Sequence, residues 1–123
     1  MEAKRIDQQP LERVRQLCLE LPGAEERLSH GAPSFFAGRT KAFVMYLDNH
    51  HGDGRLALWC KAPPGMQQDL LREDPVGFFV PPYVGARGWI GVRLDRDPDW
   101  ERVAGIIALA YDLAAPKRLR RPR

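Results

Sequence analysis

The chain reads LPGAEE at residues 21–26 and SHGAPSF at residues 29–35. Proline followed by glycine is typical of a helix end, because proline cannot continue helical hydrogen bonding and glycine accepts a left-handed backbone. A second glycine and proline then precede an apolar run that begins at Phe35. The two segments therefore predict that a helix stops, the chain makes a compact turn, and a strand begins.

Three segments carry the apolar spacing of amphipathic helices. The first runs from Leu11 to Leu21, with first-turn chemistry from Asp7 and Pro10, and ends before Pro22. The second opens at residues 63–65 and stops near residue 74, because a residue before proline disfavours helical backbone. The third is predicted to have Asp97 as its cap and an apolar stripe over residues 100–111.

Five further segments have the composition of strands joined by Gly-, Asn- and Asp-containing turns: residues 35–37, 41–47, 55–61, 78–80 and 89–94. The order is helix, three strands, helix, two strands, helix. It predicts an α+β fold in two layers, with a five-stranded antiparallel sheet and the helices on one face. We expect a single domain over residues 1–115 and a basic, flexible C-terminal tail at 116–123.

Length and composition bound the class of protein. The 123 residues suffice for one hydrophobic core, and no apolar run approaches the roughly 20 residues that cross a bilayer. The charged N-terminus lacks the apolar stretch of a secretory signal, which predicts a cytoplasmic protein without a membrane partner. Cys18 and Cys60 stand among apolar neighbours and are predicted to be reduced core thiols rather than a disulfide or metal clip.

The positive charge is concentrated at the C-terminus. The formal net charge is +3, but five of the 19 Lys and Arg residues lie at positions 117–123 without an acid among them. The remainder has 14 basic against 16 acidic residues, a net charge of about −2. Affinity for a phosphate backbone would therefore rest on this tail or on a local patch.

Two further segments are distinctive, LWCK at residues 58–61 and PPYVGARGWIGV at residues 81–92. With residues 21–26 and 29–35 they resemble the signature of the MmcQ/YjbR family, over a stretch from Leu11 to Lys117. The resemblance implies an antiparallel sheet with helices on one side. Members of this largely uncharacterised family are proposed to bind DNA through two winged hairpins. The resemblance implies that Arg87 contacts a phosphate or a groove, with Arg39 and Lys41 on the other hairpin.

Strand alternation predicts what lies on the face away from the helices. In residues 55–61 and 89–94 it places Trp59, Lys61, Trp89 and Arg93 there, and Tyr46 joins them if Phe43, Met45 and Leu47 point inward. Aromatic rings beside cations suit base stacking or cation–π contacts. The alternatives are that the tryptophans pack against the chain's own loops or against a second copy in a homodimer.

These observations favour a binding module, and two interpretations stay open. The first is DNA binding through the following cations: Arg39, Lys41, Lys61, Arg87 and Arg93. The second is a self-associating or small-ligand-binding domain with a pocket near His30, Tyr83, Arg87 and Trp89. Tyr46 and Trp59 are further candidates for ligand or interface contacts.

No catalytic residue, metal or other cofactor is predicted. Ser29 and His30 are adjacent, but neighbours in extended chain point to opposite sides, so they do not form a nucleophile–base pair. His30 is expected to fix the start of the strand through backbone hydrogen bonds, or to serve in a site. Residues 48–53 hold two His and two Asp without zinc or calcium spacing, and are predicted to be a solvated hairpin tip. Phosphate-binding, dinucleotide and nucleophile-elbow motifs are missing, which favours binding over catalysis.

Overall fold

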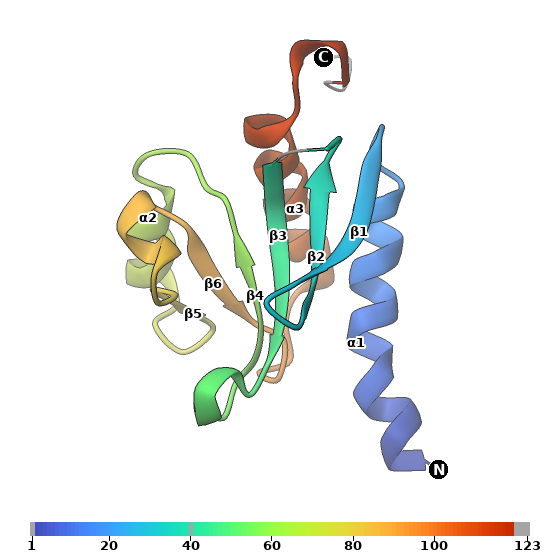
Figure 1. Ribbon diagram of the computed structural model, residues 1–123. Coiled ribbons are helices and arrows are strands. Elements are labelled where there is room, and N and C mark those ends of the chain that lie inside the picture. Colours follow the sequence, from blue (N-terminus) through green and yellow to red (C-terminus); the bar gives the residue numbers. More distant parts are fainter. Residues whose placement is uncertain (1, 40, 120–123) are drawn as a thin grey trace.

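The computed structural model describes residues 2–39 and 41–119 of the chain (Figure 1). This part contains three α-helices: α1 (Glu2–Leu19), α2 (Met66–Glu73) and α3 (Trp100–Ala114). It contains six strands: β1 (Ala24–Ser29), β2 (Ala32–Ala37), β3 (Lys41–Asp48), β4 (Leu56–Cys60), β5 (Phe78–Phe79) and β6 (Ile90–Arg93). The strands form one antiparallel sheet in the order β1-β2-β3-β4-β6-β5. Three short 3-10 turns complete the order: η1 (His50–Gly52), η2 (Val84–Arg87) and η3 (Lys117–Leu119).

The α+β class predicted from the sequence is confirmed, with the main core between the helices and one face of the sheet. Helix α3 lies behind β2 and β3 in Figure 1, and α1 runs along the β1 side. Val14 of α1 and Tyr111 of α3 are fully buried against Phe43 and Leu58 of the sheet, and α2 adds Leu70 to the same cluster. The Tyr111 and Phe43 rings meet edge to face with centroids 5.5 Å apart, a favoured aromatic geometry.

The prediction of five strands was wrong, because residues 24–29 form a sixth. The turn at Pro22-Gly23 is present, with Gly23 at φ 69°, but the chain then enters β1 directly and pairs with β2 from Ala24↔Ala37 to Ser29↔Ala32. Strand β1 lies at the edge of the sheet and is half-buried or exposed throughout. Edge strands commonly carry charges that prevent unwanted pairing, and here those charges hide the alternation that identifies a strand.

Tyr46 was predicted to lie on the face away from the helices if Phe43, Met45 and Leu47 point inward, and only Phe43 does. The β2–β3 register shifts between Phe35↔Val44 and Phe36↔Ala42, which leaves Phe43 as an extra residue. A β-bulge of this kind reverses the alternation beyond it. Tyr46 therefore packs in the main core, while Met45 and Leu47 lie on the opposite face.

The cap of α3 is Asp99 rather than Asp97. The Asp99 carboxylate accepts hydrogen bonds from the backbone N–H groups of Glu101 and Arg102 at 3.0 and 3.4 Å. Asp97 has φ 52°, a left-handed conformation that differs from the extended backbone of an N-cap. Helix α1 also begins earlier than predicted, at Glu2, with Pro10 inside it.

Both cysteines are buried free thiols in the main core, as predicted. Burial raises the pKa of Cys18 and of Cys60 far above the usual thiol range, so neither is a reactive thiolate. None of the helices described here combines the length and the apolar character of a membrane span.

The first residues of the basic C-terminal segment contact the domain. The Tyr111 hydroxyl donates to the Leu119 carbonyl oxygen at 2.6 Å and also contacts the Pro22 carbonyl oxygen. The Leu119 side chain packs against Gly23, where a Cβ atom would lie 2.9 Å from it. Residues 120–123 of the predicted tail lie outside the described residues, and the flexibility of the tail stays a prediction.

Candidate ligand-binding groove

The sheet face away from the helices carries a second apolar cluster. Its buried members come from four strands and the loop before β6: Ala32, Leu47, Ala57, Trp59, Phe79 and Trp89. Trp59 and Trp89 therefore lie on the predicted face, but only 3% and 5% of their surfaces are exposed. The chain's own loops and side chains cover them, as in the first of the predicted alternatives. The indoles thus offer little area to a second copy of the chain, and self-association stays a prediction.

The loop that covers this cluster, residues 80–89, is held in place by Gln67 of α2. The Gln67 Nε2 group donates to the carbonyl oxygens of Gly85 and Trp89, at 2.9 and 2.7 Å. Gln67 is 8% exposed, and a buried amide of this kind requires partners. Sequence reasoning missed Gln67, because a glutamine in an amphipathic helix is indistinguishable by pattern from a surface residue.

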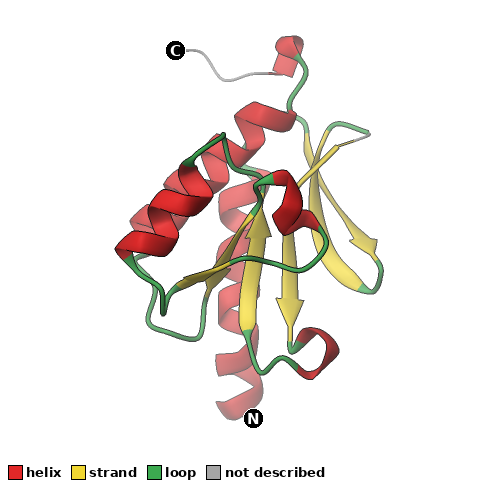
Figure 2. Cartoon of the chain, turned by 90° about the vertical axis from the view of Figure 1, so that its left-hand side faces the viewer, coloured by secondary structure: helices red, strands yellow, loops and turns green. Residues whose placement is uncertain are grey.

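A groove of about 800 Å³ runs over the second cluster, between the turns of the sheet and the 80–89 loop. Helix α2 and the turns η1 and η2 lie towards the left of Figure 1, the side that Figure 2 turns towards the viewer. The groove is lined by the following residues: Ser29, His30, Ala32, Lys41, Ala42, Met45, Leu47, His50, His51, Trp59, Lys61, Tyr83, Val84, Arg87 and Trp89. His30, Tyr83, Arg87 and Trp89, which the sequence grouped into one pocket, thus line one groove. Whether they bind a ligand stays a prediction.

Three cations line this groove, Lys41 at the start of β3, Lys61 just after β4, and Arg87 in η2. The Lys61 Nζ atom lies 5.6 Å from the centre of the Trp89 ring, within the range of a cation–π contact. Burial lowers the pKa of Lys61, and the positive charges of Arg87 and Lys41 lower it further. None of the ion pairs found among the described side chains, those of residues 9–39 and 41–119, involves these three cations.

Aromatic side chains from two loops line the groove near Trp59. The His50 ring meets Trp59 edge to face at 4.8 Å, and it has His51 at 4.1 Å and Tyr83 at 6.3 Å. Tyr83 is 75% exposed. The predicted solvated tip at residues 48–53 thus contributes His50 and His51 to the groove wall, which the sequence did not indicate.

Strained backbone gathers around the same groove. Five non-glycine residues of the described chain have positive φ. Three of them line the groove, namely His30 at 52°, His51 at 50° and Tyr83 at 66°, and Asn49 at 58° adjoins it. Such conformations cost about 1–3 kcal/mol each and persist most often at functional sites.

His30 is exposed, and its imidazole takes part in none of the hydrogen bonds of the described residues. The predicted hydrogen bonds from His30 to nearby backbone are therefore not seen.

Two buried polar atoms of the groove wall have no hydrogen-bond partner within the described residues. They are Nε1 of Trp59 and Nε2 of His50. A buried polar group left unpaired costs about 1–3 kcal/mol, so such groups are rare in folded proteins.

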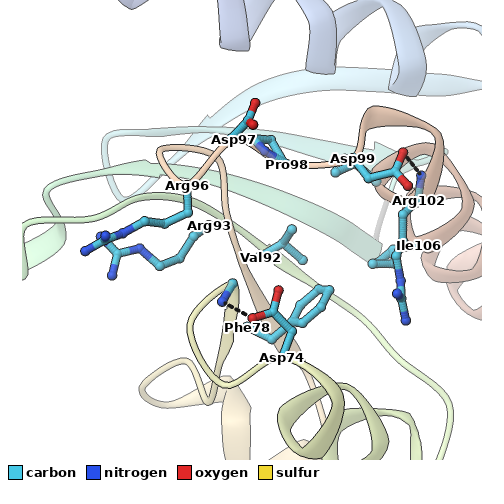
Figure 3. Close-up of a pocket in the computed structure, with 12 residues that line it drawn as sticks. Asp74, Phe78, Val92, Arg93, Arg96, Asp97, Pro98, Asp99, Arg102 and Ile106 are labelled. Atoms are coloured by element: carbon cyan, nitrogen blue, oxygen red, sulfur yellow. Dashed lines mark hydrogen bonds between the residues drawn. The ribbon is translucent and has the colours of Figure 1, made fainter.

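Two of the predicted nucleic-acid contacts lie outside the groove. Arg93 is on β6 opposite Ala57, further along the sheet than Lys61, and borders a hollow of about 240 Å³ (Figure 3). Its guanidinium donates two 3.0 Å hydrogen bonds to Asp95, and this pairing holds the pKa of Asp95 below its usual range. Arg39 borders a different hollow, beside Arg118.

The fold and the groove define a small α+β domain with a cationic, tryptophan-based cleft. The sequence model of the YjbR family matches residues 19–113, and the chain therefore belongs to the YjbR family.

A solved structure supports the same fold. The crystal structure of the Deinococcus radiodurans protein DR2400, described as a DUF419 domain, superimposes with a TM-score of 0.72 over 89% of this chain and 84% of that one, at 19% sequence identity. DUF419 is the same family. Comparison with curated proteins finds no match.

Proposed function

We propose that this YjbR-family chain is a binding module whose groove holds an organic anion with an apolar body. The observation that carries the proposal is the joint presence, in one cleft, of a tryptophan-lined apolar floor and three cations that form no ion pair with the carboxylates of the described side chains. Ligand sites are typically concave and mostly apolar, with a few convergent polar groups that fix orientation.

The chemistry of the groove argues for this ligand class. Arg87 and Lys41 repel the charged form of Lys61, and this repulsion contributes to the lowered pKa of Lys61. An anion placed among them would relieve the repulsion and gain charge-assisted hydrogen bonds. Met45 and Val84 border the buried indoles, and they offer apolar contacts to the rest of the ligand.

The first experiment compares an aromatic carboxylate with its uncharged analogue by isothermal titration calorimetry. We expect 3-phenylpropanoate to bind and 3-phenylpropanol to bind at least about tenfold more weakly, because a hydrogen bond to a charged group contributes about 1.5–3 kcal/mol. Arg87→Gln should weaken carboxylate binding by a similar factor. Arg96→Gln, which removes the same charge from the hollow of Figure 3, is the matched control and should leave binding unchanged. Equal heats for the acid and the alcohol would contradict the proposal.

A second candidate ligand, nucleic acid, is favoured by one specific observation. Lys41 borders both the groove and the hollow of about 410 Å³ that holds Arg39 and Arg118. The cations therefore continue from Arg87 and Lys61 across the β2–β3 hairpin, and a strip of this kind suits an extended polyanion better than a small molecule.

Anisotropy of a labelled single-stranded oligonucleotide tests this second candidate. We expect binding at low salt that weakens steeply with added salt, and Arg39→Gln should reduce both the affinity and the salt slope. The Arg96→Gln protein again serves as the control for charge. Absence of binding at low salt would rule out nucleic acid, because phosphate contacts are strongest there.

A further inference from the structure

We infer that Lys61 is a nucleophile that forms a reversible Schiff base with a 2-oxo acid bound in the groove. The inference rests on the proposed function and names the ligand class more closely. It adds a covalent step at one nitrogen atom, which anion binding alone does not require.

The position of Lys61 is well defined. It follows Cys60, which is fully buried, and its backbone N–H donates to the Phe43 carbonyl oxygen at 3.1 Å. The backbone is thus fixed at the end of β4, while the half-buried side chain extends over Trp89 into the groove. The amine lies at an apolar wall within a cleft large enough for a ligand.

The surroundings of Lys61 favour the neutral amine that nucleophilic attack requires. Burial is the largest cause of its lowered pKa, followed by the charges of Arg87 and Lys41. Desolvation and neighbouring cations are the two recognised means by which a protein activates a lysine for Schiff-base chemistry. The contribution of burial persists when an anion neutralises the two neighbouring cations.

The same cations select the ligand. All three cations line the groove, and the charges of Arg87 and Lys41 act on Lys61. In the proposed complex the carboxylate lies between Arg87 and Lys41, and the adjacent carbon of the ligand faces the Lys61 amine. In a 2-oxo acid this adjacent carbon is a carbonyl carbon. Its substituent would then extend over the apolar floor formed by the residues around Trp59.

The step balances without an oxidant or reductant. The nitrogen lone pair of Lys61 attacks the ketone carbon, and the carbonyl π electrons move to oxygen, which takes up a proton while nitrogen loses one. The resulting carbinolamine loses its hydroxyl group and the second amine proton as water, which leaves a C=N bond in place of the C=O bond. Hydrolysis reverses each step and releases the 2-oxo acid.

Reductive trapping with phenylpyruvate and sodium cyanoborohydride tests the inference on the full chain. The reductant supplies a hydride that converts the C=N bond to a stable secondary amine, and peptide mass spectrometry locates it. The chain has four lysines, so the other three are internal controls. We expect at least about tenfold more adduct at Lys61 than at Lys41. Lys41→Arg should retain the adduct, and Lys61→Arg should lose it.

Calorimetry with 3-phenyllactate, which carries a hydroxyl in place of the ketone, separates this inference from the proposed function. If 3-phenyllactate binds while the lysines react to similar extents with phenylpyruvate, the Schiff base is wrong and anion binding stands. If 3-phenyllactate does not bind and labelling is unselective, both are wrong. Binding of 3-phenyllactate together with selective adduct at Lys61 supports both.

Discussion

Replacing Gly91 by alanine is expected to destabilise the domain by about 1–3 kcal/mol, the usual range for forcing extra atoms into a packed core. A Cβ atom at this position would lie 2.5 Å from two carbons of the Phe79 ring and 2.6 Å from a third. Phe79 pairs with Gly91 across β5 and β6, and the Arg55 guanidinium lies 4.0 Å from the centre of its ring. The ring has little room to move, because it also belongs to the buried apolar cluster that contains both indoles.

Urea unfolding followed by circular dichroism measures this effect. Gly105→Ala is the matched control, because Gly105 is in α3 and a Cβ atom there meets nothing within 4 Å. Alanine should stabilise that helix by about 0.5–1 kcal/mol, since glycine in a helix interior is unfavourable. The same substitution should therefore have opposite signs at the two sites. A Gly91→Ala protein as stable as the unmodified chain would show that the Phe79 ring is not confined.

The fold was predictable where the apolar spacing is regular. Helix α3 buries residues at the helical period, and β4 places alternate residues in the two apolar clusters, so the sequence indicates both elements directly. Strand β1 was missed because it has no regular alternation of apolar and polar residues. It is an edge strand rich in charges, and its backbone pairing with β2 cannot be recognised from side-chain types. Tyr46 was misplaced because the bulge at Phe43 depends on the β2–β3 register, which no local pattern encodes.

The groove was predictable in part. The sequence grouped His30, Tyr83, Arg87 and Trp89 into one pocket, on the basis of the proline and glycine residues of the 80–89 loop and the histidine in the turn before β2. These four residues do line one groove. Alternation gives the face of the sheet on which a side chain lies, but it does not give the residue of the neighbouring strand that lies beside it. Arg93 was therefore grouped with Lys61, although the register places it opposite Ala57, where it pairs with Asp95. His50 joins the groove through the path of a loop, which alternation does not describe.

Replacing Gln67 by leucine is expected to destabilise the domain by about 2 kcal/mol and to weaken binding of 3-phenylpropanoate by about tenfold or more. The Gln67 amide is the side-chain donor that the described structure provides to the carbonyl oxygens of Gly85 and Trp89. Leucine has a similar volume but removes the donor to the Trp89 carbonyl oxygen and leaves the Gly85 carbonyl oxygen with the Gly88 N–H at 3.0 Å. Leaving a buried acceptor unpaired costs about 1–3 kcal/mol. The loss should appear first in the 80–89 loop, because this loop has no strand of its own to hold it.

Gln68→Leu is the control for this substitution, since Gln68 is the exposed neighbour on the same helix. Its one side-chain contact among the described hydrogen bonds is long, with Nε2 3.5 Å from the Gln67 Oε1 atom. An exposed change of this kind should alter stability by no more than about 0.5 kcal/mol.

Hydrogen exchange of the loop amides distinguishes local loosening of the loop from loosening of the whole domain. These amides include the Gly85 N–H, which donates to the Pro81 carbonyl oxygen at 3.0 Å. Faster exchange confined to residues 80–89, together with weaker carboxylate binding, would show that Gln67 acts by positioning Arg87 over the groove. Unchanged exchange and unchanged affinity in Gln67→Leu would mean that the loop keeps its shape without the amide, and that the groove does not depend on α2.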